Sequence, residues 1–268
     1  MDNWLALLKN LPQDREQLLP YLNGEGNFID FFYQVYPGIA EPIRRELERN
    51  LATRKGLKFI DLLIAQKDPN LRRWGLELID LLPAEMRIPR LLKVFDDKDE
   101  GIKLASAAYL GRMKSVEVVK ALIQGLEEER WLPARIAQAL SSMGEFSVPQ
   151  LIELSKGDNE KLREYAVEIL SDIGTTDAGE AVREAFDDDS SIVRRTAIKA
   201  SEKFPSQFFE DALIAALLRE QDIPTKIQIV RTISKLRLSQ AKPALKLELT
   251  ANDPKLVQAA RRALEAFV

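Results

Sequence analysis

Apolar residues recur at intervals of three and four positions in the chain, and this periodicity predicts α-helices. Between Ser147 and Ser201, the first apolar stripe contains Val148, Leu151, Ile152 and Leu154. The second contains Leu162, Ala166, Ile169, Leu170 and Ile173. Helix-breaking residues lie near the stripe ends, at Gly144, Gly157, Gly174 and Pro205. Because no alternation of polar and apolar residues is long enough to indicate a strand, we expect an all-α chain.

The helical stripes themselves repeat along the chain. Similar ten-residue segments begin at intervals of 30, 31 or 33 residues, at Leu71, Ile102, Leu132, Leu162, Val193, Ile223 and Leu256. One helical pair cannot bury its apolar face alone, so this period indicates a solenoid of about seven stacked helix–turn–helix units. Within the units, we expect Asp158 and Asp189 to be the N-caps of second helices.

The second helices resemble those of HEAT repeats, in particular the short bacterial type named after phycobilisome lyase (PBS lyase) subunits. The pattern of that type, Asp-x-x-x-Val-Arg-x-x-Ala, is matched by Asp189, Val193, Arg194 and Ala197. The resemblance implies a right-handed α-α superhelix of the HEAT/armadillo-like kind, formed by residues 53–268 and preceded by an irregular helical cap, residues 1–52. It also implies that the second helices line the concave side. In such repeats, each Arg and the Asp that precedes it form a ladder linking adjacent units, and the resemblance gives this structural role to Arg72, Arg163 and Arg194.

The composition argues against catalysis. The chain has no histidine and no cysteine, which removes the commonest general base, the commonest metal ligand and every thiolate. Deoxyhypusine hydroxylases share the expected architecture, but they hold iron with paired His-Glu motifs that this chain cannot supply. We therefore predict no catalytic residue, no metal ligand and no cofactor.

Clusters of carboxylates are the remaining candidates for chemistry. They occur at Asp96–Asp97 with Asp99, at Glu127–Glu129 and at Asp187–Asp189. A calcium site or an acid/base pair would use such groups. However, the clusters recur at one phase of the repeat, between the first and second helices. This recurrence favours a structural role, in which the carboxylates cap helix N-termini and complement the helix dipole.

Positive charge is concentrated on the second helices of the C-terminal half. The whole chain has a formal charge of −3, whereas the second helices expected at 192–203, 223–237 and 255–267 are strongly basic. We predict a basic strip on the concave face, with these candidate partner-binding residues: Arg195, Lys199, Arg231, Lys235, Arg261 and Arg262. A segregated field of this kind attracts an acidic partner.

Aromatic residues are concentrated near the N-terminus instead. Trp4, Tyr21, Phe28, Phe31, Phe32, Tyr33 and Tyr36 all lie within the first 36 residues. A terminal repeat lacks one neighbour, so these side chains are expected to close the core as a cap. A docking site for a partner is the alternative, and Phe28, Phe31 and Phe32 are its candidate residues.

These features favour a non-catalytic protein–protein interaction scaffold or adaptor, which binds an acidic partner segment on its concave face. One alternative is a nucleic-acid-binding protein similar to HEAT-like DNA glycosylases, although the net negative charge disfavours nucleic acid as a partner. The others are a chromophore-lyase subunit and the soluble part of a membrane-tethered regulatory scaffold. A small-molecule partner is not expected. No apolar run reaches the roughly 18 residues of a membrane span, so we expect a cytoplasmic chain.

Overall fold

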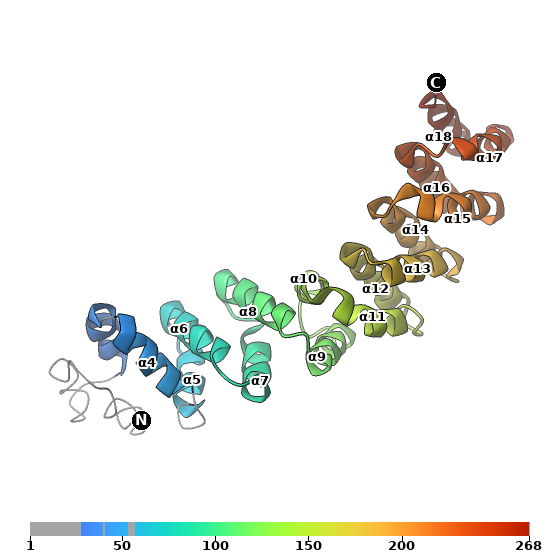
Figure 1. Cartoon of the computed structure of the whole chain (residues 1–268). Helices are drawn as coiled ribbons and strands as arrows, with labels where there is room; N and C mark the ends of the chain where they lie inside the picture. The colour runs from blue at the N-terminus through green and yellow to red at the C-terminus, as the bar shows by residue number, and fades with distance from the viewer. Residues whose placement is uncertain (1–27, 40, 53–56, 268) are drawn as a thin grey trace. The chain divides into compact units, whose positions relative to one another are not determined.

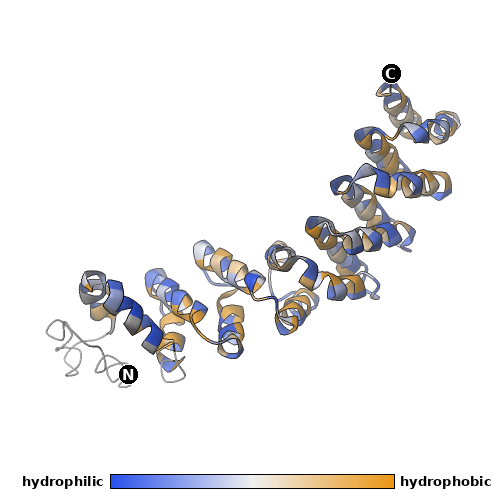
Figure 2. Ribbon diagram, in the orientation of Figure 1, coloured by the Kyte–Doolittle hydropathy of each residue, from blue (hydrophilic) through white to orange (hydrophobic). Residues whose placement is uncertain are grey.

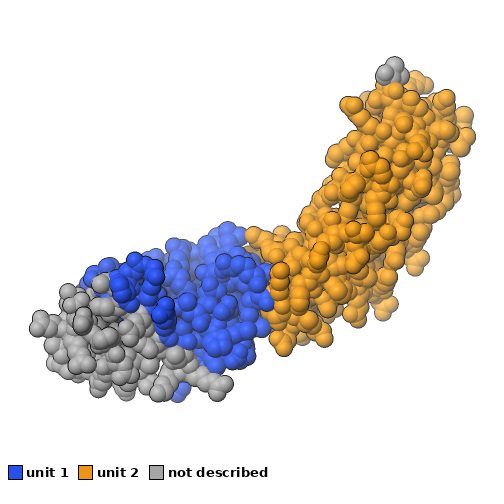
Figure 3. Space-filling model, in the orientation of Figure 1, with its two compact units in different colours: residues 1–113 blue, residues 114–268 orange. Residues whose placement is uncertain are grey.

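The computed structural model of the chain describes residues 28–39, 41–52 and 57–267. Among these residues, helices and the turns between them make up the structure and no strand occurs. The predicted all-α solenoid is thereby confirmed. Contacts divide the chain into two compact units, residues 1–113 and residues 114–268 (Figure 3).

Unit 1 begins, in its described part, with short helical segments and continues with helix pairs. The first segments are α3 (Phe28–Asp30), the π-helical η1 (Phe31–Val35), the 3₁₀ turn η2 (Tyr36–Gly38) and α4 (Glu41–Leu51). The pairs that follow are α5 (Leu57–Ile64) with α6 (Pro69–Asp80), and α7 (Ala84–Val94) with α8 (Glu100–Arg112).

Unit 2 consists of five further helix pairs. They are α9 (Val116–Glu127) with α10 (Pro133–Met143), α11 (Val148–Leu154) with α12 (Glu160–Ile173), α13 (Thr176–Glu184) with α14 (Ser191–Ala200), α15 (Ser206–Arg219) with α16 (Ile223–Leu236), and α17 (Lys242–Leu247) with α18 (Pro254–Glu265). Short 3₁₀ segments extend several helices: η3 (Gly144–Ser147), η4 (Ala185–Asp187), η5 (Ser201–Lys203), η6 (Ser239–Ala241) and η7 (Glu248–Thr250).

The helices of unit 2 form two layers. Each second helix contacts the second helix of the next pair, in the order α10, α12, α14, α16 and α18 (Figure 1). First helices such as α15 and α17 contact one another in the other layer. Almost every helix carries both polar and apolar residues (Figure 2). Between the layers, small residues such as Ala166 and Ala197 are fully buried, whereas Leu162, expected in the core, is only half buried.

The structure corrects the expected helix starts by one residue. The N-cap of α12 is Asn159 and not Asp158, because the Asn159 side chain accepts hydrogen bonds from the backbone N–H groups of Lys161 and Leu162. Ser190, and not Asp189, caps α14 in the same way. Asp, Asn and Ser can all cap a helix, so residue type alone does not show which of two neighbouring polar residues is the N-cap.

Two of the expected repeat openings are also wrong. Leu132 is 60% exposed and stands before the first residue of α10, while Ile223 is the first residue of α16. Each is followed by a proline in the first turn, a position that needs no backbone N–H. In α16, fully buried Thr225 therefore takes the place that Val193 holds in α14.

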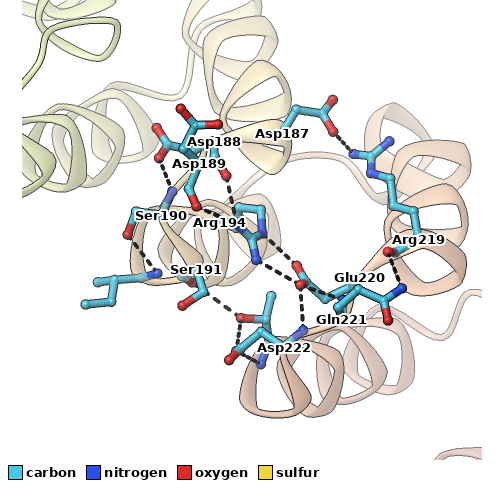
Figure 4. A network of polar contacts seen from close by, with 12 residues as sticks. Asp187, Asp188, Asp189, Ser190, Ser191, Arg194, Arg219, Glu220, Gln221 and Asp222 are labelled. Atoms are coloured by element: carbon cyan, nitrogen blue, oxygen red, sulfur yellow. Dashed lines mark hydrogen bonds and ion pairs between the residues drawn. The ribbon is translucent and has the colours of Figure 1, made fainter.

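A ladder of ion pairs joins successive repeats within each unit. In unit 2, the Arg194 guanidinium on α14 donates two hydrogen bonds to the Glu220 carboxylate, at 2.7 and 2.8 Å (Figure 4). It also donates to the backbone carbonyls of Asp188 and Asp189, while Glu220 accepts from the backbone N–H of Asp222. The same geometry recurs in the pairs Arg72–Asp97 and Arg163–Asp188, both at 2.7–2.9 Å.

The next pair of the ladder uses lysine. Lys226 follows Thr225 on α16 as Arg194 follows Val193 on α14, and its ammonium lies 2.8 Å from the Glu248 carboxylate. Both side chains are largely buried. The repeat that contains Ile223 therefore does have a ladder cation. It is Lys226, three residues after Ile223.

The three ladder carboxylates that pair with arginine are held in the charged form. Burial alone would raise the pKa of Asp188, but hydrogen bonds from Arg163 and from the Ser190 backbone hold that pKa below its ordinary value. The pKa values of Asp97 and Glu220 are lowered for the same reason, against the same opposing effect of burial. The ladder therefore stabilises the fold as charged pairs.

Adjacent arginines on α14 provide a matched test of the ladder. Arg194→Ala should lower the free energy of unfolding by about 3 kcal/mol, because it leaves the buried Glu220 carboxylate without its counter-charge. Arg195→Ala removes a side chain without a hydrogen bond or ion pair among the described residues, and should change stability by less than about 0.5 kcal/mol. Urea denaturation of both variants measures the difference. Equal losses would contradict the structural assignment.

The lowered carboxylate pKa values also predict a dependence on pH. A carboxyl whose folded pKa lies below its unfolded pKa contributes stability that is complete above the unfolded value, near 4. This stability is lost as the pH falls through the folded pKa. The urea midpoint should therefore decrease below about pH 4, and Glu220→Gln should make that decrease shallower. Identical slopes for the two proteins would show that the Glu220 pKa is not lowered.

Candidate partner-binding surface

The residues of the predicted basic strip lie on three neighbouring second helices of unit 2. Arg195 and Lys199 are on α14, Arg231 and Lys235 on α16, and Arg261 and Arg262 on α18. These helices contact one another in that order. All six side chains are exposed except that of Arg195, which is half buried.

Three of the six line a groove between α16 and α18, which we call the C-terminal groove. Its volume is about 570 Å³, and its apolar floor includes the half-buried Ile227 and Ala259. Its basic lining residues are Arg231, Lys235, Lys255 and Arg262. Among the described residues that line it, none is acidic. The groove thus combines an apolar floor with positive charge, most of which has no ion-pair partner among the described residues.

A second groove, of about 790 Å³, lies over α12, α14 and the start of the C-terminal groove, and we call it the central groove. Arg195, Lys199 and Lys235 line it, and Lys235 is shared with the C-terminal groove. Three carboxylates on α12 face these cations, and we call them the acidic row: Glu164, Glu168 and Asp172. Their spacing of four residues puts them on one helix face. The prediction of the basic strip did not consider this spacing, because it considered only the charges of the last three second helices.

Several cations that contributed to the predicted strip are already paired. Arg194 and Lys226 belong to the ladder. Lys203 pairs with Asp172, and Lys235 pairs with Glu202 at 2.5 Å. Within the described part of the chain, the other five candidates have no side-chain hydrogen bond or ion pair: Arg195, Lys199, Arg231, Arg261 and Arg262. Arg261 lines neither groove, so the available charge is concentrated on fewer residues than the sequence suggests.

The other carboxylate clusters serve the scaffold. Asp188 holds Arg163, and Asp187 pairs with Arg219. Asp99 caps α8 by accepting a hydrogen bond from the backbone N–H of Ile102, and Glu129 pairs with Lys161. Among the described residues, no group of three His, Cys, Asp or Glu side chains could hold a metal ion.

Comparison with known proteins agrees with this architecture. The sequence matches the family of HEAT repeats over residues 57–143 and 148–208, which is more than half of its length. The chain belongs to the HEAT-repeat family. The PBS lyase subtype is not distinguished by this match. No curated protein matches the sequence.

Several solved structures, natural and designed, are also similar to the chain. Human deoxyhypusine hydroxylase in complex with glycerol is 15% identical, with a TM-score of 0.40, and the match covers 93% of this chain and 98% of that one. A designed armadillo repeat protein in complex with the peptide (KR)4 is 16% identical, with a TM-score of 0.39 and coverage of 79% and 99%. An engineered protein is also 16% identical, with a TM-score of 0.39 and coverage of 98% and 83%.

The N-terminal aromatic residues pack against the first HEAT repeat. Phe31 is only 1% exposed and therefore offers no surface to a partner. Phe32 is half buried and stacks on Trp74 of α6, with ring centroids 5.0 Å apart, and on Tyr36 at 5.7 Å. Trp4, Tyr21 and the side chain of Phe28 lie outside the described residues. The packing of Phe31 and Phe32 is that expected of a cap, and partner docking through this cluster stays an untested prediction.

Truncation of Phe32 tests this assignment. Phe32→Ala should lower the free energy of unfolding by about 2 kcal/mol, because the stacking on Trp74 and Tyr36 is lost. Leu104→Ala, at an exposed apolar position on α8, serves as the control and should cost less than about 0.5 kcal/mol. Both can be measured by urea denaturation. An unchanged midpoint for Phe32→Ala would return this aromatic side chain to the candidates for partner contact.

Proposed function

We propose that this HEAT-repeat protein is a non-catalytic adaptor that binds an acidic segment of a protein partner across α14, α16 and α18. The observation that carries the proposal is the C-terminal groove, where basic side chains flank an apolar floor and none of the described lining residues is acidic. A segment with carboxylates flanking a small apolar side chain complements both features. We expect this helix layer to be the concave face, as the resemblance to HEAT repeats implies.

The chemistry of the groove divides the work of binding. Burial of an apolar side chain against the half-buried Ile227 and Ala259 supplies affinity, at about 25 cal/mol per Å² of apolar surface. Arg231 and Arg262 present forked guanidinium groups that can bind a carboxylate through two hydrogen bonds. Their long-range field accelerates the encounter with an acidic partner.

The alternatives are less well supported by the same surface. A nucleic-acid backbone crossing this layer would meet the acidic row, which repels phosphate. A chromophore-lyase subunit would follow from the PBS lyase resemblance of the repeats. The soluble part of a membrane-tethered scaffold is the last alternative. Among the described helices, none is long and apolar enough to cross a membrane. We place the adaptor in the cytoplasm.

Charge reversal in the C-terminal groove tests the proposed function. The probe is a fluorescent peptide with glutamate and leucine on opposite helical faces, and association is followed by stopped-flow anisotropy at low and high salt. Arg231→Glu combined with Arg262→Glu should slow association roughly tenfold at low salt and weaken the salt dependence. The helical fold should persist, because both side chains are exposed.

A matched variant controls for net charge. Lys120→Glu combined with Lys246→Glu changes the total charge equally, but these exposed lysines lie on the first helices α9 and α17. This control should bind the peptide nearly as well as the original protein. If both variants bind alike, the groove is not the contact surface. Tight, salt-dependent binding of duplex DNA without peptide binding would favour the nucleic-acid alternative.

A further inference from the structure

The second-helix layer of unit 2 changes sign between α12 and α14. The acidic row on α12 faces Arg195, Lys199 and Lys203, which follow the same four-residue spacing on α14 and η5. Beyond them, the C-terminal groove is lined by cations and no anions among its described residues. A ligand crossing the layer from α12 to α18 would therefore pass from negative to positive surface.

The facing rows neutralise one another only in part. Lys203 pairs with Asp172, and Glu164 accepts a hydrogen bond from the Thr196 hydroxyl at 3.0 Å. In the described structure, the Glu168 carboxylate has no hydrogen bond or ion pair, nor do the side chains of Arg195 and Lys199. Two positions on each side of the central groove thus retain charge for an external partner.

The pKa of Glu168 is affected by its position in the acidic row. Partial burial and the nearby carboxylates of Glu164 and Asp172 raise its pKa, whereas the charges of Lys203 and Lys199 lower it, and the net direction is upward. A cationic side chain from a partner would relieve the remaining repulsion among these carboxylates. The acidic row therefore complements a basic part of the same ligand whose acidic part lies in the C-terminal groove.

We propose that the partner segment is bipolar, with basic residues over α12 and acidic residues over α16 and α18, so that its charge order fixes its direction on the layer. The inference rests on the proposed function and adds the ligand's direction to it. Packed helices are spaced by roughly 10 Å, so the crossing from α12 to α18 spans roughly 30 Å. That distance corresponds to about nine residues of extended chain.

Two synthetic peptides test the charge order by fluorescence anisotropy. The first is bipolar, with lysines in one half and glutamates in the other, and the second has glutamates in both halves. The bipolar peptide should bind the original protein roughly tenfold more tightly than the acidic one. Glu164→Lys combined with Glu168→Lys should reverse this preference. An unchanged ratio of the two affinities would overturn the proposed polarity.

The direction can be measured because the chain contains no cysteine. Gln138→Cys on α10, next to α12, and Gln258→Cys in the C-terminal groove each accept one fluorophore. A quencher on the basic end of the bipolar peptide should quench the label on α10, and a quencher on the acidic end should quench the label on α18. Equal quenching at both sites would contradict a fixed direction.

The reversed pair Arg231→Glu and Arg262→Glu separates this inference from the proposed function. If neither peptide loses affinity in that variant, the C-terminal groove is not the binding surface, and the proposed function fails. If both peptides lose affinity while the variant of Glu164 and Glu168 leaves their ratio unchanged, the adaptor function stands and the polarity is wrong.

Discussion

The contact between a buried cation and the carboxylate of the following repeat is the constraint on which this structure depends. A helix pair has little core of its own, so its position is set by the neighbours on which it stacks. The Arg194 guanidinium joins two loops: the loop before its own helix, through the carbonyls of Asp188 and Asp189, and the loop before the next second helix, through Glu220. Each such cation fixes the spacing and rotation of one repeat against the next.

The same helices carry the candidate binding surface because consecutive residues of a helix point in different directions. Arg194 turns into the ladder, and Arg195 turns to the central groove. Turning α14 enough to free Arg194 would therefore also remove Arg195 from the groove. The scaffold and the surface are thus coupled through backbone geometry, although no contact joins the two arginine side chains.

The sequence predicted those parts of the molecule that depend on local patterns. Helical periodicity, the repeat length and the motif containing Val193 and Arg194 were enough for the fold and for the cation of the ladder. The acceptor Glu220 could not be identified, because it follows Arg194 by 26 residues and any acidic residue at that place would serve. The repeat register was misread at Leu132 and Ile223, where proline obscures the start of the helix.

The candidate surface was predicted less completely, for a related reason. All six residues of the basic strip were placed on the correct helix layer. A sum of charges over single helices cannot show that Lys235 is paired with Glu202 of the preceding repeat. The acidic row was also missed, because α12 is not one of the three basic helices expected at 192–203, 223–237 and 255–267. The four-residue spacing of Glu164, Glu168 and Asp172 is the signal that could have revealed that row.

The lysine in the ladder gives the last repeat a different mechanical character. An arginine fork grips its carboxylate at two points, whereas Lys226 reaches Glu248 with a single ammonium group, and a point charge restrains rotation less than a planar fork does. The junction between the repeat of α15 and α16 and the repeat of α17 and α18 therefore restrains rotation less than the arginine junctions of the ladder do. The C-terminal groove spans this same junction, because one wall is α16 and the other is α18. A segment bound there would add a further contact across this junction. Stiffening of the junction and retention of the segment would then depend on the same free energy of binding.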